Sequence, residues 1–375
     1  MFGRFAALAG FSIALSLFAA CDGSGPAASA RPDPATSGLQ ARAFVEAMQP
    51  VRPGRPVVAV LALNDGTEMS DLLLPYALLT RADVADVRIV APRAGRVDLY
   101  PALQIDGAQA LADFDRLHPL GADYVIVPAM SRDDDPELLA WLRRQVDAGA
   151  RIIGVCVGAR VLGQAGLLDG RRFTGHWYDR RTLLRHPGAT WVPDQRYIVD
   201  RGVATTTGIS ASVPTMLALV EALGGGERAQ ALAADLGVES WDPSHDSARF
   251  GLGARHAWTY VADELAFWRD ETWRVEVRDG IDDVALALVV DAWSRTGRVQ
   301  VVAASDAASV VLRSGLRLVA ADSVDEQMPR IALEPALAPV RQLDRTLTQI
   351  AERFGETRRD RVMQEMEYPG GRPTS

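Results

Sequence analysis

Lysine is absent from the sequence: all 40 residues counted as Lys or Arg are arginine. Schiff-base catalysis and a P-loop nucleotide site both need a lysine, so the sequence excludes both. Positive charge is also scarce overall, because 48 acidic residues leave a net charge of −8 and the arginines form no concentrated stripe. Nucleic-acid binding needs a concentrated basic surface, so we expect no nucleic-acid partner.

Cysteine is nearly absent too, with Cys21 and Cys156 as the two thiols. If Cys21 carries lipid, no disulfide can form within the chain, and Cys156 is a free thiol in an oxidising compartment. Such a thiol favours a functional role. A single cysteine can instead act as a small buried hydrophobic residue, so the interpretation of Cys156 depends on its local sequence.

A long apolar run occurs at the N-terminus, where Arg4 precedes a run from Phe5 to Phe18, small residues and Cys21. This order is typical of an export signal, and the run is too short for a bilayer span of about 20 residues. Its end resembles a bacterial lipobox. We predict a signal peptide over residues 1–21, a lipid on Cys21 that anchors an exported protein to the cell envelope, and a flexible linker over residues 22–53. The alternatives are an ordinary signal peptide or an uncleaved anchor with an incidental cysteine.

After this linker the sequence alternates between strand and helix patterns. Short β-branched runs at 56–63, 87–91, 123–128 and 151–155 predict buried parallel strands, and amphipathic helices are expected between them. This alternation predicts an α/β fold with a doubly wound parallel sheet. Ligands of such sheets lie at the carboxyl ends of the strands, which places the chemistry in the turns that follow them.

One of these turns reads Gly154-Val155-Cys156-Val157-Gly158, between a buried strand and a helix. The flanking glycines allow the sharp turn of a nucleophile elbow, with cysteine in the place of serine. A following helix N-terminus stabilises a thiolate, so we expect the pKa of Cys156 to lie below the free-thiol value of about 8.5.

The run GVCVGARVLGQAGLLDGRRFTGHW resembles the core signature of the ThiJ/PfpI superfamily, closest to the branch of AraC-type regulator domains and isonitrile hydratases. The blocks TEMSDLLLPYALL, DYVIVPAM and GVATTTGISASVPTMLALVEALGG agree with it in order. The resemblance implies a flavodoxin-like domain over residues 54–238.

The resemblance also implies the residues of the site. The acidic partner of Cys156 falls on Asp71, which without the resemblance would be interpreted as a solvated carboxylate on a helix. His176 falls on a histidine that can act as a general acid or base. The remaining expected pocket positions are an oxyanion donor at Val157, the loop residues Ala129 and Met130 where the family often has glycines, and the loop residues Thr207 and Gly208.

Two related activities are disfavoured. No histidine is followed two positions later by glutamate, as glutamine amidotransferases of this fold require, and Val157 stands where the peptidase branch has histidine. The resemblance implies a hydratase or hydrolase that acts on a small electrophile of the isonitrile or carbonyl class through Cys156, Asp71 and His176, without metal or organic cofactor. The alternative is a non-catalytic module that senses a small ligand or an oxidant.

The C-terminal third resembles the first domain. DGTEMSDLLLPYALLTR (65–81) aligns with DGIDDVALALVVDAWSR (279–295), and residues 215–238 align with 345–368 at a constant offset of 130. We therefore predict a degenerate α/β half-copy over residues 271–369, reached through a connector over 239–270. The alternative is chance similarity between two strand-helix units.

The half-copy has Ala285 where the first copy has Asp71, and it lacks the elbow segment. The resemblance implies that domains of this family commonly pair through surfaces near the site, and a tethered copy can cover that surface within one chain. This predicts a monomer that is an internal pseudo-dimer.

The lipid anchor gives the first testable prediction. A Cys21→Ala variant should leave the membrane fraction, because one acyl chain would be the anchor. Fractionation followed by salt extraction measures this. A variant that stays in the membrane fraction and resists salt would show that Cys21 is incidental.

Overall fold

The computed structural model describes residues 34–251, 271–321 and 324–370. The predicted signal peptide, Cys21 and most of the predicted connector lie outside these ranges. Within them, no helix is long and apolar enough to cross a membrane.

The predicted linker is wrong over part of its length, because helix α1 (Pro34–Ala47) lies within it. Phe44, inside the helix, and Met48, just after it, are spaced four residues apart and are buried. The Phe44 ring packs edge-on against Tyr197, and the Tyr124 hydroxyl donates to the Met48 carbonyl at 2.7 Å. The small and polar composition of the segment concealed this apolar stripe.

The main sheet has the predicted parallel core, flavodoxin-like and doubly wound. Its neighbouring strands run β10-β11-β7-β6-β1-β3-β5-β15-β14, and from β11 through β5 all pairs are parallel. The strand bounds are β1 Val57–Leu61, β3 Asp86–Ala91, β5 Gln104–Ala110, β6 Tyr124–Val127, β7 Arg151–Gly154, β10 Tyr197–Asp200, β11 Val203–Thr206, β14 Ser309–Val311 and β15 Arg317–Val319. Two further strands near its edge, β2 (Thr67–Glu68) and β4 (Gly95–Tyr100), pair with each other.

Helices cover both faces of this sheet, and β1 shows how its side chains divide between them. Val58 and Val60 belong to the hydrophobic cluster under α2, α7 and α8, whereas Ala59 and Leu61 belong to the cluster under α3, α4 and α5. The helix bounds are α2 Met69–Ala82, α3 Leu111–Leu117, α4 Pro136–Asp147, α5 Gly158–Gln164, α7 Ser212–Gly224 and α8 Gly226–Leu236. The short elements β8 (Arg172–Phe173), α6 (Arg180–Leu183) and β9 (Thr190–Trp191) lie between β7 and β10 along the chain.

The C-terminal region is also α/β, and its order resembles that of the first part. Its three-stranded parallel sheet runs β13-β12-β16, as the first sheet runs β3-β1-β6. Helices α11 and α12 end 130 residues after α7 and α8, at the offset that the sequence predicts. The bounds are β12 Glu271–Glu276, α10 Asp283–Ser294, β13 Val299–Ala304, β16 Arg330–Ile331, α11 Pro339–Phe354 and α12 Glu356–Met366.

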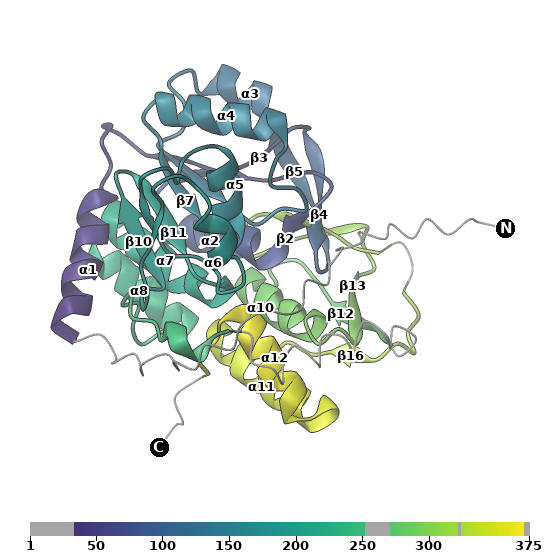
Figure 1. Cartoon of the computed structure of the whole chain (residues 1–375). Helices are drawn as coiled ribbons and strands as arrows, with labels where there is room; N and C mark the ends of the chain where they lie inside the picture. The colour runs from purple at the N-terminus through teal and green to yellow at the C-terminus, as the bar shows by residue number, and fades with distance from the viewer. Residues whose placement is uncertain (1–33, 252–270, 322–323, 371–375) are drawn as a thin grey trace.

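The two regions are joined by a shared sheet and a shared core. Strand β15 pairs antiparallel with β5, with Leu318 opposite Ile105. Helix α10 packs against α2, and its residues 283–293 are all buried, including Val284 and Leu288. Figure 1 shows α11 and α12, in yellow, beside α10 and on the side of the molecule away from α3 and α4. The C-terminal region is therefore not a separately packed unit.

Candidate functional site

The elbow forms where the sequence predicts it. Strand β7 ends at Gly154, Cys156 has a φ of 52°, and α5 starts at Gly158. A side chain at Gly158 would place its Cβ 2.0 Å from the Val127 carbonyl oxygen, so only glycine allows this close approach. A left-handed backbone at a residue other than glycine costs about 1–2 kcal/mol. Strain of this kind persists at functional sites, where the surrounding structure maintains it.

The surroundings of Cys156 differ from the expectation. The residue is 4% exposed, and its backbone N–H donates to Thr206 Oγ1 at 2.9 Å. Burial raises the pKa of the thiol, and the acids Asp71 and Glu68 raise it further, because an ionised carboxylate beside the thiol disfavours a thiolate. The predicted lowering of the Cys156 pKa is therefore wrong. It assumed an exposed elbow, and at the buried site desolvation and two acids favour the neutral thiol.

Asp71 lies in the first turn of α2 and is fully buried, not solvated. Its Oδ2 accepts the Ala129 N–H at 3.1 Å, and among the residues that the structure describes no N–H or O–H donates to Oδ1. Burial raises the pKa of Asp71 to about 8, so this acid holds a proton at neutral pH.

Glu68 and Arg295 complete the cluster, and the sequence analysis missed both. Glu68 Oε2 caps α2 by accepting the Asp71 N–H at 2.6 Å, while Oε1 accepts Arg295 Nη2 at 2.7 Å. Arg295 Nε also donates to Asp291 Oδ1 at 2.8 Å, and the other Asp291 oxygen accepts the Ser70 hydroxyl. The C-terminal region thus contributes a buried cation to the acid–thiol site.

A second arginine makes the reverse contact. Arg81, at the end of α2, pairs with Asp282 at 2.9 Å and with Asp283, and Asp282 caps α10 by accepting the Ala285 N–H. Arg295 follows α10 and pairs with Glu68, the cap of α2. In the predicted alignment Arg81 matches Arg295, so the two contacts are reciprocal. This alignment was the signal that could have identified Arg295.

His176 is not placed as a free acid or base. Its Nε2 lies 3.0 Å from the Glu365 carbonyl, which can only accept, so Nε2 carries the proton. Its Nδ1 accepts the Tyr178 N–H at 3.3 Å. The ring therefore holds the end of α12. His245, which the sequence placed in a connector, is instead buried beside Glu367, with Nε2 3.9 Å from a carboxylate oxygen.

Several of the expected pocket residues already bond to other parts of the protein. The Ala129 N–H is bonded to Asp71 and is not an open oxyanion donor, while Met130 forms a bridge with Thr67. Val157 lies at the N-cap of α5. Beyond β11, the Thr207 N–H donates to the Arg196 carbonyl and the Gly208 N–H donates to Glu367. Within the described residues, no group of three His, Cys, Asp or Glu side chains is arranged to hold a metal.

Comparisons with known proteins match the domain that contains this site. The model of the DJ-1/PfpI family matches residues 57–222. The isonitrile hydratase of Pseudomonas putida is 33% identical over 164 residues, which cover 43% of this chain and 69% of the relative. The HTH-type transcriptional regulator GlxA of Rhizobium meliloti is 40% identical over 171 residues, which cover 45% of this chain and 52% of the regulator. This chain therefore spans only about half the length of the regulator.

Solved structures match the same part of the fold less closely. A THiJ/PfpI family protein from Pseudomonas syringae is 24% identical and covers 57% of this chain and 87% of its own, with a TM-score of 0.47. An AraC family transcriptional regulator from Pseudomonas putida is 21% identical and covers 48% of this chain and 98% of its own, with a TM-score of 0.42.

The raised pKa of Asp71 predicts a pH effect on stability. The folded pKa of about 8 exceeds the unfolded value of about 3.9, so the stability contributed by protonated Asp71 is complete below pH 4 and is lost as the pH rises through 8. Burial is the main cause of this raised pKa, and the groups that face Asp71 and modify it are the Ala129 N–H, Arg295, Asp291 and Glu68. Asp71→Asn should therefore gain stability relative to the wild type as the pH rises from 5 to 9. Denaturant unfolding at several pH values measures the difference, and parallel curves for the two proteins would contradict it.

Proposed function

Because the chain belongs to the DJ-1/PfpI family, we propose that it adds water to a small electrophile, of the isonitrile or carbonyl class, through Cys156 and Asp71. The observation that carries the proposal is a fully buried Asp71 carboxyl, whose pKa burial raises, near a thiol held on a strained elbow. The similarity to an isonitrile hydratase supports the substrate class. No metal or organic cofactor is needed for this chemistry.

The raised pKa of Cys156 shapes the mechanism, because no standing thiolate is available at neutral pH. Cys156 Sγ attacks the electrophilic carbon while its proton passes to Asp71, and Asp71 gives its own proton to the substrate atom that gains the electron pair. A C–S bond forms, and the charge of the acid–thiol pair does not change. Water then attacks the same carbon, the C–S bond breaks, and the thiol recovers its proton.

Arg295 is a positioning residue in this scheme. Its guanidinium holds Glu68 in place as the cap of α2, and Glu68 in turn fixes the backbone of Asp71. Its positive charge opposes the burial that raises the pKa values of Glu68, Asp71 and Cys156. Without this cation, the two acids and the thiol would hold their protons still more tightly.

A second candidate is small-ligand sensing without turnover. Two observations favour it: Cys156 is buried, and the end of α12 contacts the loop that carries His176 and Trp177. The similarity to a regulator supports this candidate as well. Sensing of an oxidant is the weaker form, because a buried thiol with a raised pKa reacts slowly.

We also propose that the C-terminal region replaces a partner subunit in a monomer. The reciprocal pairs Arg81–Asp282 and Arg295–Glu68, and the pairing of β5 with β15, support an internal pseudo-dimer. The pattern of residues 1–21 supports a site located at the cell envelope, attached through lipid on Cys21.

Turnover of a panel of small isonitriles and aldehydes tests the enzymatic proposal. Cys156→Ala and Asp71→Asn should each lower kcat/KM by at least about a hundredfold, because each removes one proton carrier of the reaction. Asp283→Asn is the matched control: it changes a buried carboxyl in the first turn of α10 that is not among the groups that shift the pKa of Cys156, and it should retain turnover. A wild-type protein that binds panel members by thermal shift without turnover would support the sensing candidate instead.

Variants of the two reciprocal arginines can separate an effect on the pKa of Cys156 from an effect on the stability of the fold. Arg295→Met and Arg81→Met each break a buried ion pair and should each lower stability by about 3 kcal/mol. Only Arg295→Met should raise the pH midpoint of iodoacetamide labelling at Cys156, because this arginine offsets Asp71, Glu68 and Glu367 around the thiol. If both variants moved the midpoint equally, Arg295 would have no specific role.

A further inference from the structure

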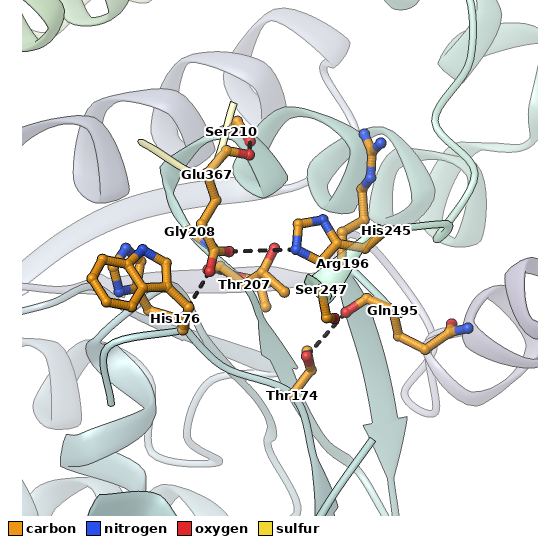
Figure 2. Close-up of polar contacts among 12 residues, drawn as sticks. Thr174, His176, Gln195, Arg196, Thr207, Gly208, Ser210, His245, Ser247 and Glu367 are labelled. Carbon is orange, nitrogen blue, oxygen red and sulfur yellow. Dashed lines mark hydrogen bonds and ion pairs between the residues drawn. The ribbon is translucent and has the colours of Figure 1, made fainter. Parts of the chain in front are cut away.

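The side chain of Glu367 reaches from the end of α12 into the loops that follow β8 and β11. Its Oε1 accepts the Trp177 N–H at 2.7 Å and its Oε2 accepts the Gly208 N–H at 2.5 Å. Figure 2 shows this carboxylate beside Gly208, with His245 on its other side. The residue is 2% exposed, so two backbone amides from different loops bind one carboxylate away from water. Such charge-assisted bonds are stronger than neutral ones.

This arrangement adjoins the thiol. Thr206, whose hydroxyl accepts the Cys156 N–H, lies two residues before Gly208. The negative charge of Glu367 is close enough to contribute to the raised pKa of Cys156. A carboxylate bound by the Trp177 and Gly208 amides is therefore a neighbour of the proposed reaction centre.

The backbone at Glu367 is unfavourable for a residue other than glycine. Its φ is 49°, in the left-handed region, and it terminates α12. At the offset of 130 residues, α8 ends at Gly237 with a φ of 77°, and glycine is the usual residue at this position. A glutamate here costs about 1 kcal/mol relative to glycine, so the carboxylate is retained at a cost in stability.

The carboxylate is not needed merely to hold α12 in place. The Trp177 indole N–H donates to the Gln364 carbonyl at 3.0 Å, and the Ser210 hydroxyl donates to the Glu367 carbonyl at 2.6 Å. With His176 on Glu365, three side chains already bind the carbonyls at the end of the helix. Gly208 also leaves room for the glutamate, since a Cβ there would lie 2.8 Å from the Glu367 Cβ.

We propose that the Trp177 and Gly208 amides form a carboxylate subsite beside Cys156, and that Glu367 occupies it as an internal ligand. The ligand of the site is then a small molecule that carries a carboxylate, which displaces Glu367 when it binds. This inference rests on the proposed function only in taking the Cys156 pocket as the place where a small molecule binds.

Two alkylating reagents with the same leaving group test the subsite without any turnover. Iodoacetate carries a carboxylate, whereas iodoacetamide carries an amide in its place. Glu367→Gly vacates the subsite and leaves glycine in the left-handed position that it prefers. In this variant of the full chain, the ratio of iodoacetate to iodoacetamide labelling at Cys156 should rise about tenfold over the wild type, as one or two charge-assisted bonds would give. Millimolar acetate should remove the preference. Peptide mass spectrometry restricts the readout to Cys156.

A second change fills the vacated space. In the Glu367→Gly background, Gly208→Ala should abolish the iodoacetate preference while iodoacetamide labelling persists, because the new methyl group projects to where the Glu367 side chain lay. If Glu367→Gly does not fold, Glu367→Ala provides the same test, since it also removes the carboxylate from the Trp177 and Gly208 amides. Equal acceleration of both reagents, or no change in either, would show that Glu367 is a structural contact and would overturn the proposal. A failure of the turnover assays would leave this result standing, because alkylation needs only the thiol.

Discussion

The ion pair between Arg295 and Glu68 connects the two regions of the chain with the chemistry of its thiol. Glu68 caps α2 through the Asp71 N–H, Arg295 binds Glu68 from the end of α10, and the Asp71 carboxyl lies beside Cys156. A buried pair of this kind offsets its desolvation cost only with good geometry and further hydrogen bonds, which Asp291 supplies. The contact between α10 and α2 therefore places a cation beside the acid–thiol pair, where it opposes the rise in pKa that burial causes.

Local sequence was sufficient for the parts of the fold that depend on short-range pattern. The β-branched runs predicted strands β1, β6 and β7, and the two glycines around Cys156 predicted the elbow whose backbone the structure shows at a φ of 52°. The helix α1 was missed because its apolar stripe consists of few residues in a segment rich in small ones. The resemblance, and not the pattern, identified Asp71.

The charges of the site could not be predicted in this way, because they depend on contacts between distant segments. Glu68 and Arg295 are separated by 227 residues, and His176 contacts a carbonyl 189 residues away. The direction of the Cys156 pKa also depends on the folded environment: the elbow alone favours a thiolate, but burial and the two acids favour the thiol. Burial in the folded protein determines the direction of the pKa shift of Cys156, and it cannot be predicted from the residues around the elbow.

The C-terminal region contributes to the site although it lacks a second elbow. It supplies Arg295, whose charge stabilises the ionised forms of the buried acids. It also supplies Glu367, whose carboxylate accepts hydrogen bonds from the Trp177 and Gly208 amides. These two residues act in opposite directions on Cys156, since the arginine lowers its pKa and the glutamate raises it. A ligand carboxylate that displaced Glu367 would substitute one negative charge for another. The electrostatic environment of the thiol would then be conserved on binding, and only its accessibility would change.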